Sequence, residues 1–114
     1  MGIMNGDRII IYFIQLKNSD GFIKIGSSFN LNLRLKQFKK IYPYEIELLY
    51  NFECYSDKIG GGLQNIEYKL HQKFKKYKLP KINEWFYPNK EILEYIEYLK
   101  KVKIEHQCIS PPRG

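Results

Sequence analysis

The chain has 114 residues, of which 44% are hydrophobic, and it carries a formal net charge of +7. This length and apolar content suffice for one domain with a modest core, which excludes a disordered chain. The longest apolar stretch, residues 9–14, is far shorter than the roughly 18 apolar residues of a membrane span. Because this stretch also lacks a secretory cleavage site, we expect an intracellular protein. The charge favours nucleic acid as a partner over a membrane, although the Lys-, Ile-, Asn- and Tyr-rich composition of an AT-rich genome would produce it as well.

The first predicted element is an antiparallel β-hairpin. Arg8–Leu16 is nearly all apolar and rich in β-branched and aromatic residues, which predicts a central strand covered on both faces. The polar cluster Asn18–Gly21 supplies turn chemistry, and Phe22–Ser27 forms the returning strand.

A helix and a third strand follow the hairpin. Side chains in the segment Ser27–Asn30 can cap a helix of about Leu31–Lys40, and Pro43 lies just beyond its end. The apolar stripe of this helix comprises Leu31, Leu35, Phe38 and Ile41. The imperfect alternation in Glu45–Glu53 predicts a third strand.

The second half of the chain is predicted to be mostly helical. After the glycines at 60–62, one helix is expected over about Leu63–Tyr77 and another over about Asn89–Lys103, with the short apolar segment Trp85–Tyr87 between them. The predicted fold class is therefore α/β (α+β), with a small three-stranded antiparallel sheet flanked by about three helices.

The predicted organisation is a single domain over residues 9–104. Residues 1–8 form an N-terminal extension, and residues 105–114 form a flexible tail. Cys54 and Cys108 are expected to be reduced thiols, since two cysteines make neither a disulfide framework nor a zinc site.

Two charged residues lie near the apolar stripe of their helices. Glu67 falls about 60° from the centre of the second helix's stripe, and His71 lies one turn later at its shoulder. An unpaired buried carboxylate is costly, so Glu67 is expected either to have a structural ion-pair partner, to be solvated at the shoulder of the helix, or to bind a metal such as Mg²⁺. Arg34 lies within about 45° of the stripe of the first helix. It can pair with Glu67 or hold a phosphate through its two-pronged guanidinium.

The register of the hairpin tests a third feature. If Tyr12 lies opposite Gly26, then Tyr12, Lys24 and Gly26 share one face of the sheet, whereas a shift of one residue separates Tyr12 from Lys24. Gly26 would let a backbone or a substrate approach closely. The alternatives are an outward-facing lysine on an exposed strand face and a plain core tyrosine.

These residues, taken together, resemble the motifs of the GIY-YIG nuclease superfamily, most closely its T5orf172 and MUG113 branch of small viral, phage and microbial domains. Ile10-Ile11-Tyr12 stands for the first signature and Lys24-Ile25-Gly26 for the second, and Arg34 follows at the family's distance. Glu67–Phe74 resembles the branch's Glu-His-Phe helix, and Asn83–Phe86 its Glu-Trp-Phe segment.

The resemblance implies a mechanism of DNA phosphodiester hydrolysis. Glu67 would bind one divalent cation, Mg²⁺ or alternatively Mn²⁺, that stabilises the leaving 3′ oxygen. Tyr12 would act as the general base or position one, and Arg34 would hold the scissile phosphate. Lys24 would contact the phosphate or orient water. Accessory roles are implied for Gly26, His71 and Asn83.

Departures from the family pattern keep alternatives open. Ile10 replaces the first glycine, and Lys24 replaces the second signature's tyrosine, which leaves the general base unidentified. The leading interpretation is a metal-dependent endonuclease that acts on DNA, with a homodimer as one way to cut both strands. The alternatives are a catalytically impaired nucleic-acid-binding module on the same fold and a protein-interaction or host-defence accessory domain.

Overall fold

The structure is a computed structural model that describes residues 8–18, 20–55, 62–82 and 84–102. Three predicted features lie outside these residues: most of the N-terminal extension over 1–8, the tail over 105–114 with Cys108, and the accessory residue Asn83.

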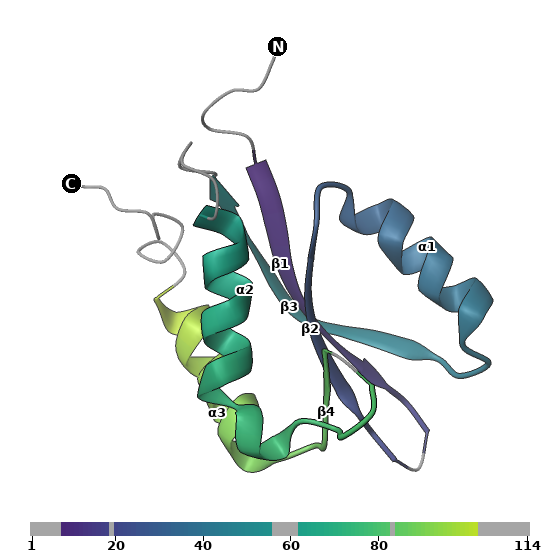
Figure 1. Cartoon of the computed structure of the whole chain (residues 1–114). Helices are drawn as coiled ribbons and strands as arrows, with labels where there is room; N and C mark the ends of the chain where they lie inside the picture. Colours follow the sequence, from purple (N-terminus) through teal and green to yellow (C-terminus); the bar gives the residue numbers. More distant parts are fainter. Residues whose placement is uncertain (1–7, 19, 56–61, 83, 103–114) are drawn as a thin grey trace.

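Four antiparallel strands form one sheet in the order β3-β1-β2-β4 (Figure 1). β1 (Arg8–Leu16) lies between β2 (Ile23–Ser28) and β3 (Ile46–Tyr55), which confirms its predicted central position. β4 (Trp85–Phe86) pairs with the outer edge of β2 at Ile23 and Lys24. The predicted fold class is confirmed, but the predicted count of three strands is one too few, because the apolar segment at Trp85 adds a short fourth strand.

The hairpin register places Tyr12 opposite Gly26 on one side and Asn51 on the other. Tyr12, Lys24 and Gly26 therefore lie on the same face of the sheet, as one of the two possible registers predicted. The connecting turn matches its predicted chemistry, since Gly21 has a φ of 61° and the Asn18 side chain accepts hydrogen bonds from the amides of Asp20 and Gly21.

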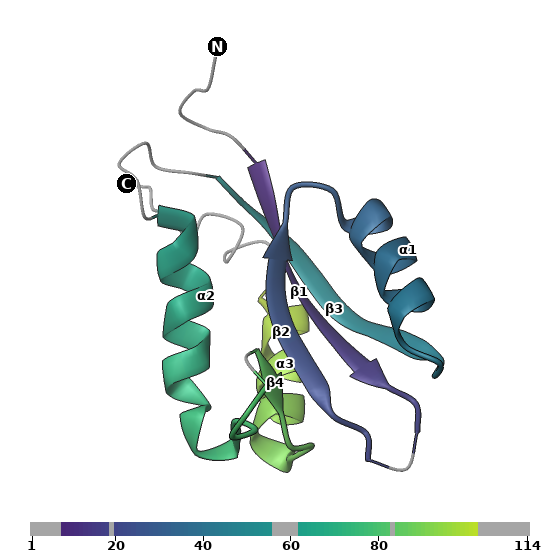
Figure 2. The ribbon, with the colours of Figure 1, turned by 45° about the vertical axis from the view of Figure 1, so that its right-hand side comes forward.

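Helices cover both faces of this sheet (Figures 1 and 2). α1 (Leu31–Ile41) packs on the face that holds Tyr12, whereas α2 (Gly62–Lys73) and α3 (Lys90–Lys101) pack on the other face. The core on the α1 side is formed by Ile10, Tyr12, Ile14, Leu16, Leu31, Phe38, Leu79 and Trp85. The larger core on the other side draws on the alternate strand residues, among them Ile11, Phe13, Ile23 and Ile25, and on Leu70, Phe74, Ile92, Ile96 and Leu99.

Side-chain caps fix the start of α1 and of α3. The Asn30 side chain accepts a hydrogen bond from the amide of Leu33 at 3.1 Å, and the Asn89 side chain accepts one from the amide of Ile92 at 2.9 Å. The predicted stripe of α1 is wrong at Ile41, because this last residue of the helix is 64% exposed.

The second helix is shorter than its sequence pattern predicts. α2 ends at Lys73, and the chain continues in a single 3₁₀ turn, η1 (Lys75–Tyr77), in which the Tyr77 amide donates to the Phe74 carbonyl at 2.9 Å. Hydrophobic periodicity does not distinguish this tighter turn from another α-helical turn. None of the helices in the described part of the chain is long and apolar enough to cross a membrane.

Candidate functional site

Tyr12 lies at the centre of β1 with none of its surface exposed, and its phenol ring extends over Gly26 on β2. A Cβ atom added to Gly26 would lie 2.5 Å from the Tyr12 hydroxyl oxygen and 2.7 Å from the carbon that carries it. The sequence predicted that a backbone or a substrate approaches closely at Gly26; the group that does so is the phenol of Tyr12. Gly26 is therefore required by the position of Tyr12.

The Tyr12 hydroxyl is buried, and no described residue makes a hydrogen bond of good geometry with it. Burial raises the pKa of Tyr12 to about 12, against a smaller lowering by the nearby Arg34 guanidinium and small increases from Glu84 and Glu67. Three charged groups from separate segments of the chain, α1, α2 and the residue before β4, thus act on one phenol. A buried hydroxyl without a partner costs about 1–3 kcal/mol, which indicates that this position is not optimised for folding alone.

Lys24 is buried on the same face, 8% exposed, and its ammonium group lies 2.6 Å from a carboxylate oxygen of Glu84. The rings of Phe38 and Trp85 flank it, with their centroids 5.6 and 5.5 Å from Nζ. The alternative of an outward-facing lysine on an exposed strand face is therefore wrong. Lys24 instead holds an acidic side chain at the edge of β2.

Glu84 is a member of this cluster that sequence reasoning missed. It immediately precedes β4, and its carbonyl accepts a hydrogen bond from the amide of Ile25 at 3.1 Å. Its φ of 73° makes it the one residue other than glycine with a positive φ in the described ranges, a conformation that costs about 1–2 kcal/mol for an L-residue. The only signal in the sequence was its place in the Glu-Trp-Phe segment, and no role was assigned to it.

Arg34 projects from α1 toward Tyr12, as its place near the apolar stripe predicted. Its side chain is half-buried, and its amide donates to the carbonyl of the capping residue Asn30 at 3.1 Å. The predicted alternative of an Arg34–Glu67 ion pair is absent, because no described carboxylate lies within ion-pair distance of the Arg34 guanidinium. The N–H groups of the Arg34 guanidinium can therefore donate hydrogen bonds to an anion.

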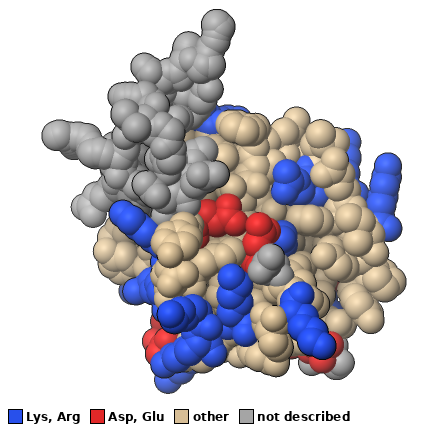
Figure 3. All heavy atoms as spheres, viewed as in Figure 1, with Lys and Arg blue, Asp and Glu red and all other residues tan. Residues whose placement is uncertain are grey.

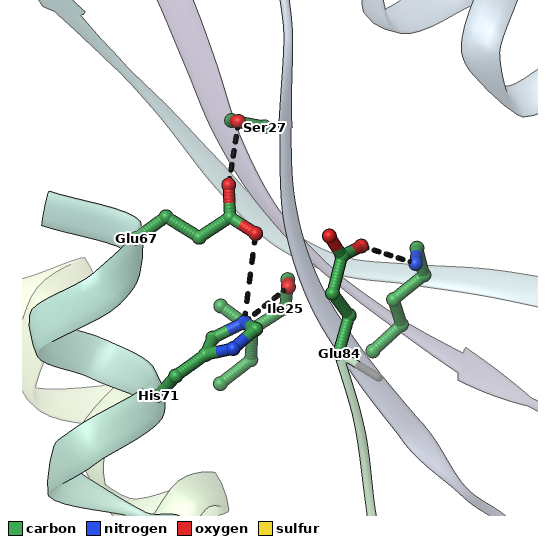
Figure 4. A network of polar contacts seen from close by, with 6 residues as sticks. Ile25, Ser27, Glu67, His71 and Glu84 are labelled. Atoms are coloured by element: carbon green, nitrogen blue, oxygen red, sulfur yellow. Dashed lines mark hydrogen bonds and ion pairs between the residues drawn. The ribbon is translucent and has the colours of Figure 1, made fainter. Parts of the chain in front are cut away.

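Glu67 extends from α2 toward the face of β2 that carries Ser27 (Figure 4). One carboxylate oxygen accepts a hydrogen bond from the Ser27 hydroxyl at 2.7 Å, and the other lies 3.6 Å from Nε2 of His71. Its side chain is 18% exposed, so the carboxylate lies in a partly solvated position. The sequence placed Ser27 at the end of a strand and among the capping candidates for α1 but did not connect it with Glu67, whereas its hydroxyl orients that carboxylate.

His71 is a buried positioning residue. Its Nε2 lies 2.9 Å from the carbonyl oxygen of Ile25. Because a carbonyl can only accept, Nε2 carries a proton and donates it. The imidazole also packs edge-on against Phe86. His71 thus ties α2 to the centre of β2 and, one helical turn from Glu67, fixes the direction in which that carboxylate points.

These residues meet at the part of β2 that extends beyond β4. Tyr12, Lys24 and Arg34 lie on the α1 side of the sheet. Glu67 approaches β2 from the α2 side (Figure 4). On the face shown in Figure 3, a small acidic area lies over β2 between α1 and α2, and Lys and Arg side chains lie around it. Of the predicted site residues, only Asn83 is outside the described chain.

The donor set fits only a weakly held, largely hydrated metal ion. Within the described residues, no group of three or more His, Cys, Asp or Glu side chains could enclose a metal. His71 offers a proton rather than a lone pair at Nε2, which leaves Glu67 as the available ligand in this corner. Mg²⁺ commonly binds through one or two carboxylates and keeps several waters, so a single carboxylate beside a substrate phosphate suits this ion.

Comparison with known proteins identifies one family. The model of the T5orf172 domain family matches residues 9–104, which is most of the chain. No curated protein and no solved structure matches significantly.

Proposed function

The chain belongs to the T5orf172 domain family, which is associated with the GIY-YIG-like nuclease fold, and we propose that it is a divalent-metal-dependent endonuclease acting on DNA. One observation carries this proposal: the buried Tyr12 hydroxyl makes no hydrogen bond of good geometry with any described residue and lies within electrostatic reach of both Arg34 and Glu67. A phenol donor, a guanidinium beside it and a carboxylate around one point are the groups that a phosphodiester needs.

Arg34 binds the scissile phosphate. Its guanidinium has no carboxylate partner in the part of the chain that the structure describes, and two of its N–H groups can donate to two non-bridging oxygens. The side chain is long and only half-buried, so it can turn from Tyr12 toward an incoming phosphate. This movement opens the path to the Tyr12 hydroxyl, which is otherwise enclosed.

Tyr12 acts as a hydrogen-bond donor. With a pKa of about 12, only about 1 phenol in 10⁵ is ionised at pH 7, so the neutral hydroxyl is the working form. It donates to a phosphate oxygen or to the attacking water, and so gains the partner that it lacks in the free protein. Because Tyr12 is packed in the centre of the sheet, this donor is preorganised.

Glu67 holds the metal ion, which when bound supplies Lewis-acid stabilisation of the charge on the leaving 3′ oxygen. Ser27 and His71 keep the carboxylate directed toward β2. Glu67 lies on the face of β2 that holds Ser27, whereas Tyr12 and Lys24 lie on the other face. This placement suits an in-line displacement, in which the nucleophile approaches the phosphorus from one side and the leaving group departs on the other.

The test is nicking of supercoiled plasmid at low salt with Mg²⁺, with Mn²⁺ and with EDTA. Glu67→Gln preserves the shape of the side chain but removes its charge, and we expect at least a 100-fold loss of nicking with little change in stability or DNA affinity. Glu97→Gln, on the exposed face of α3, is the matched control and is expected to cleave like the wild type. Full activity of Glu67→Gln would contradict the assigned role.

A binding module without catalysis is the second candidate, favoured by the enclosure of Lys24. At the position of the second signature's tyrosine, this side chain is engaged by Glu84 and two aromatic rings, away from open solvent. A gel shift by the wild type together with no nicking under any metal condition would favour this candidate.

A further inference from the structure

Tyr12 and Lys24 occupy the positions of the two signature residues, yet neither is suited to accept a proton. The Tyr12 phenol is neutral far into the alkaline range and enclosed, and the Lys24 ammonium is a donor that is already bound to a carboxylate. His71 donates through Nε2 to the Ile25 carbonyl and lies on the other face of the sheet. The reaction therefore lacks a proton acceptor among the residues so far assigned to it.

Glu84 provides what these residues lack, a carboxylate that is fixed in place and exposed to water. It lies beside β2, to which its carbonyl is bound through the Ile25 amide. Lys24 holds one carboxylate oxygen at 2.6 Å, and the side chain is 40% exposed, so water reaches it without any rearrangement. In Figure 4 the Glu67 and Glu84 carboxylates lie on opposite sides of the β2 ribbon, with the second oxygen of Glu84 directed toward that strand.

The backbone of Glu84 supports a role beyond folding. A glycine or an asparagine adopts a φ of 73° at lower cost than a glutamate does. The strain is maintained because the residue is fixed at two points, its carbonyl on Ile25 and its carboxylate on Lys24. A strained residue that carries a charged, water-accessible group at a candidate site is a functional candidate.

We propose that Glu84 is the general base of the cleavage reaction and that Lys24 positions it. This inference rests on the proposed nuclease function. The Glu84 carboxylate accepts a proton from the attacking water as the water oxygen bonds to phosphorus. The bond from phosphorus to the 3′ oxygen breaks with its electron pair, and that oxygen takes a proton from solvent. Glu84 then returns its proton to solvent, to which it is open.

The charged and titratable groups that share this environment come from four elements. They are Tyr12 on β1, Lys24 on β2, Arg34 on α1 and Glu67 on α2. The positive charges of Lys24 and Arg34 match the negative charges of the two carboxylates, Glu67 and Glu84.

The first experiment compares single-turnover nicking by the wild type and by Glu84→Gln at saturating protein and pH 7. We expect the rate constant to fall 10²- to 10⁴-fold, as for loss of a general base, while DNA affinity stays within threefold. Glu47→Gln is the matched control, because it removes the carboxylate of another Lys–Glu pair, at 2.9 Å from Lys17, away from the site. A Glu84→Gln rate within threefold of the wild type would overturn the inference.

A second measurement separates a base from a merely structural partner of Lys24. Hydroxide attacks without a base, so the residual rate of Glu84→Gln should rise about tenfold per pH unit between pH 7 and 9, whereas the wild type changes little. In a Lys24→Met background, Glu84→Gln should still lower the rate at least tenfold. No further loss in that background means that Glu84 acts only through Lys24, and the inference fails. If the wild type itself does not nick DNA, the proposed function fails and this inference with it.

Discussion

At the scale of single residues, the site contains groups that lower the stability of the fold. Tyr12 has a buried hydroxyl without a partner, Lys24 is an ammonium among aromatic rings, and Glu84 has a left-handed backbone. Each carries a cost that an apolar residue or a glycine would avoid at the same position. The three are adjacent in space, which argues that the costs serve a common purpose.

Tyr12→Phe separates folding from function at this site. Removing a buried hydroxyl that has no partner should leave the free energy of unfolding unchanged or raise it by up to about 1 kcal/mol. Nicking should fall at least 100-fold, because the donor to the phosphate or the water is lost. Urea unfolding and the plasmid assay measure the two effects. A variant that is destabilised by more than about 1 kcal/mol would show that the hydroxyl has a structural partner after all.

Sequence reasoning found some of these residues and missed others for physical reasons. Tyr12, Lys24, Arg34 and Glu67 were recognisable because a polar group on an apolar stripe or strand is conspicuous. Glu84 was not, since its positive φ follows from pairing between segments 60 residues apart in the chain. The Ser27–Glu67 contact was equally hidden, because it depends on where α2 crosses the sheet.

At the scale of elements, α1 connects helix capping to chemistry. Its first turn is fixed by Asn30, whose side chain caps the Leu33 amide and whose carbonyl accepts from the Arg34 amide. A frayed first turn would let the Arg34 guanidinium lose its place beside Tyr12. The Asn30 cap therefore affects the position of Arg34 as well as the stability of α1.

Comparison of two caps tests this coupling. Asn30→Ala and Asn89→Ala each remove a side-chain cap and should each lower the free energy of unfolding by about 1 kcal/mol. Only Asn30→Ala should also slow nicking, by roughly three- to tenfold, since α3 carries none of the assigned residues. Equal nicking by the two variants in conditions where both are folded would show that α1 does not position Arg34.

Most elements were predictable from sequence, and each of the two exceptions has its own cause. The three long strands and the starts of α1 and α3 follow from local pattern and capping residues. β4 and the early end of α2 do not, because Trp85–Phe86 becomes a strand only by pairing with β2, and the 3₁₀ turn after Phe74 keeps the helical hydrophobic period.

At the scale of the whole molecule, charge and site occupy different parts of one face. The net charge is +7, yet the centre of the face in Figure 3 is acidic, with Lys and Arg side chains around it. Such an arrangement favours the approach of a polyanion to the basic rim, and it leaves the central carboxylates available for the roles that we propose for them.

DNA binding should accordingly depend steeply on salt and little on the central carboxylates. We expect log K to fall linearly with log salt concentration, with a slope of roughly −3 to −5 if four or five phosphates contact the rim. Glu67→Gln should keep that slope, because the substitution does not touch the rim. Fluorescence anisotropy with a labelled duplex from 50 to 300 mM KCl measures both. An affinity that does not vary with salt would exclude binding through the basic rim.

The contact between Tyr12 and Gly26 also limits the order in which these two residues could be substituted in evolution. The three atoms nearest to a Cβ at position 26 all belong to the Tyr12 phenol, so a side chain at position 26 requires that this phenol move or become smaller. A descendant that no longer needs the phenol could lose the aromatic residue first and the glycine afterwards, whereas the reverse order would meet this clash. We therefore expect a side chain at position 26 to accompany a smaller residue at position 12 in a relative of this chain.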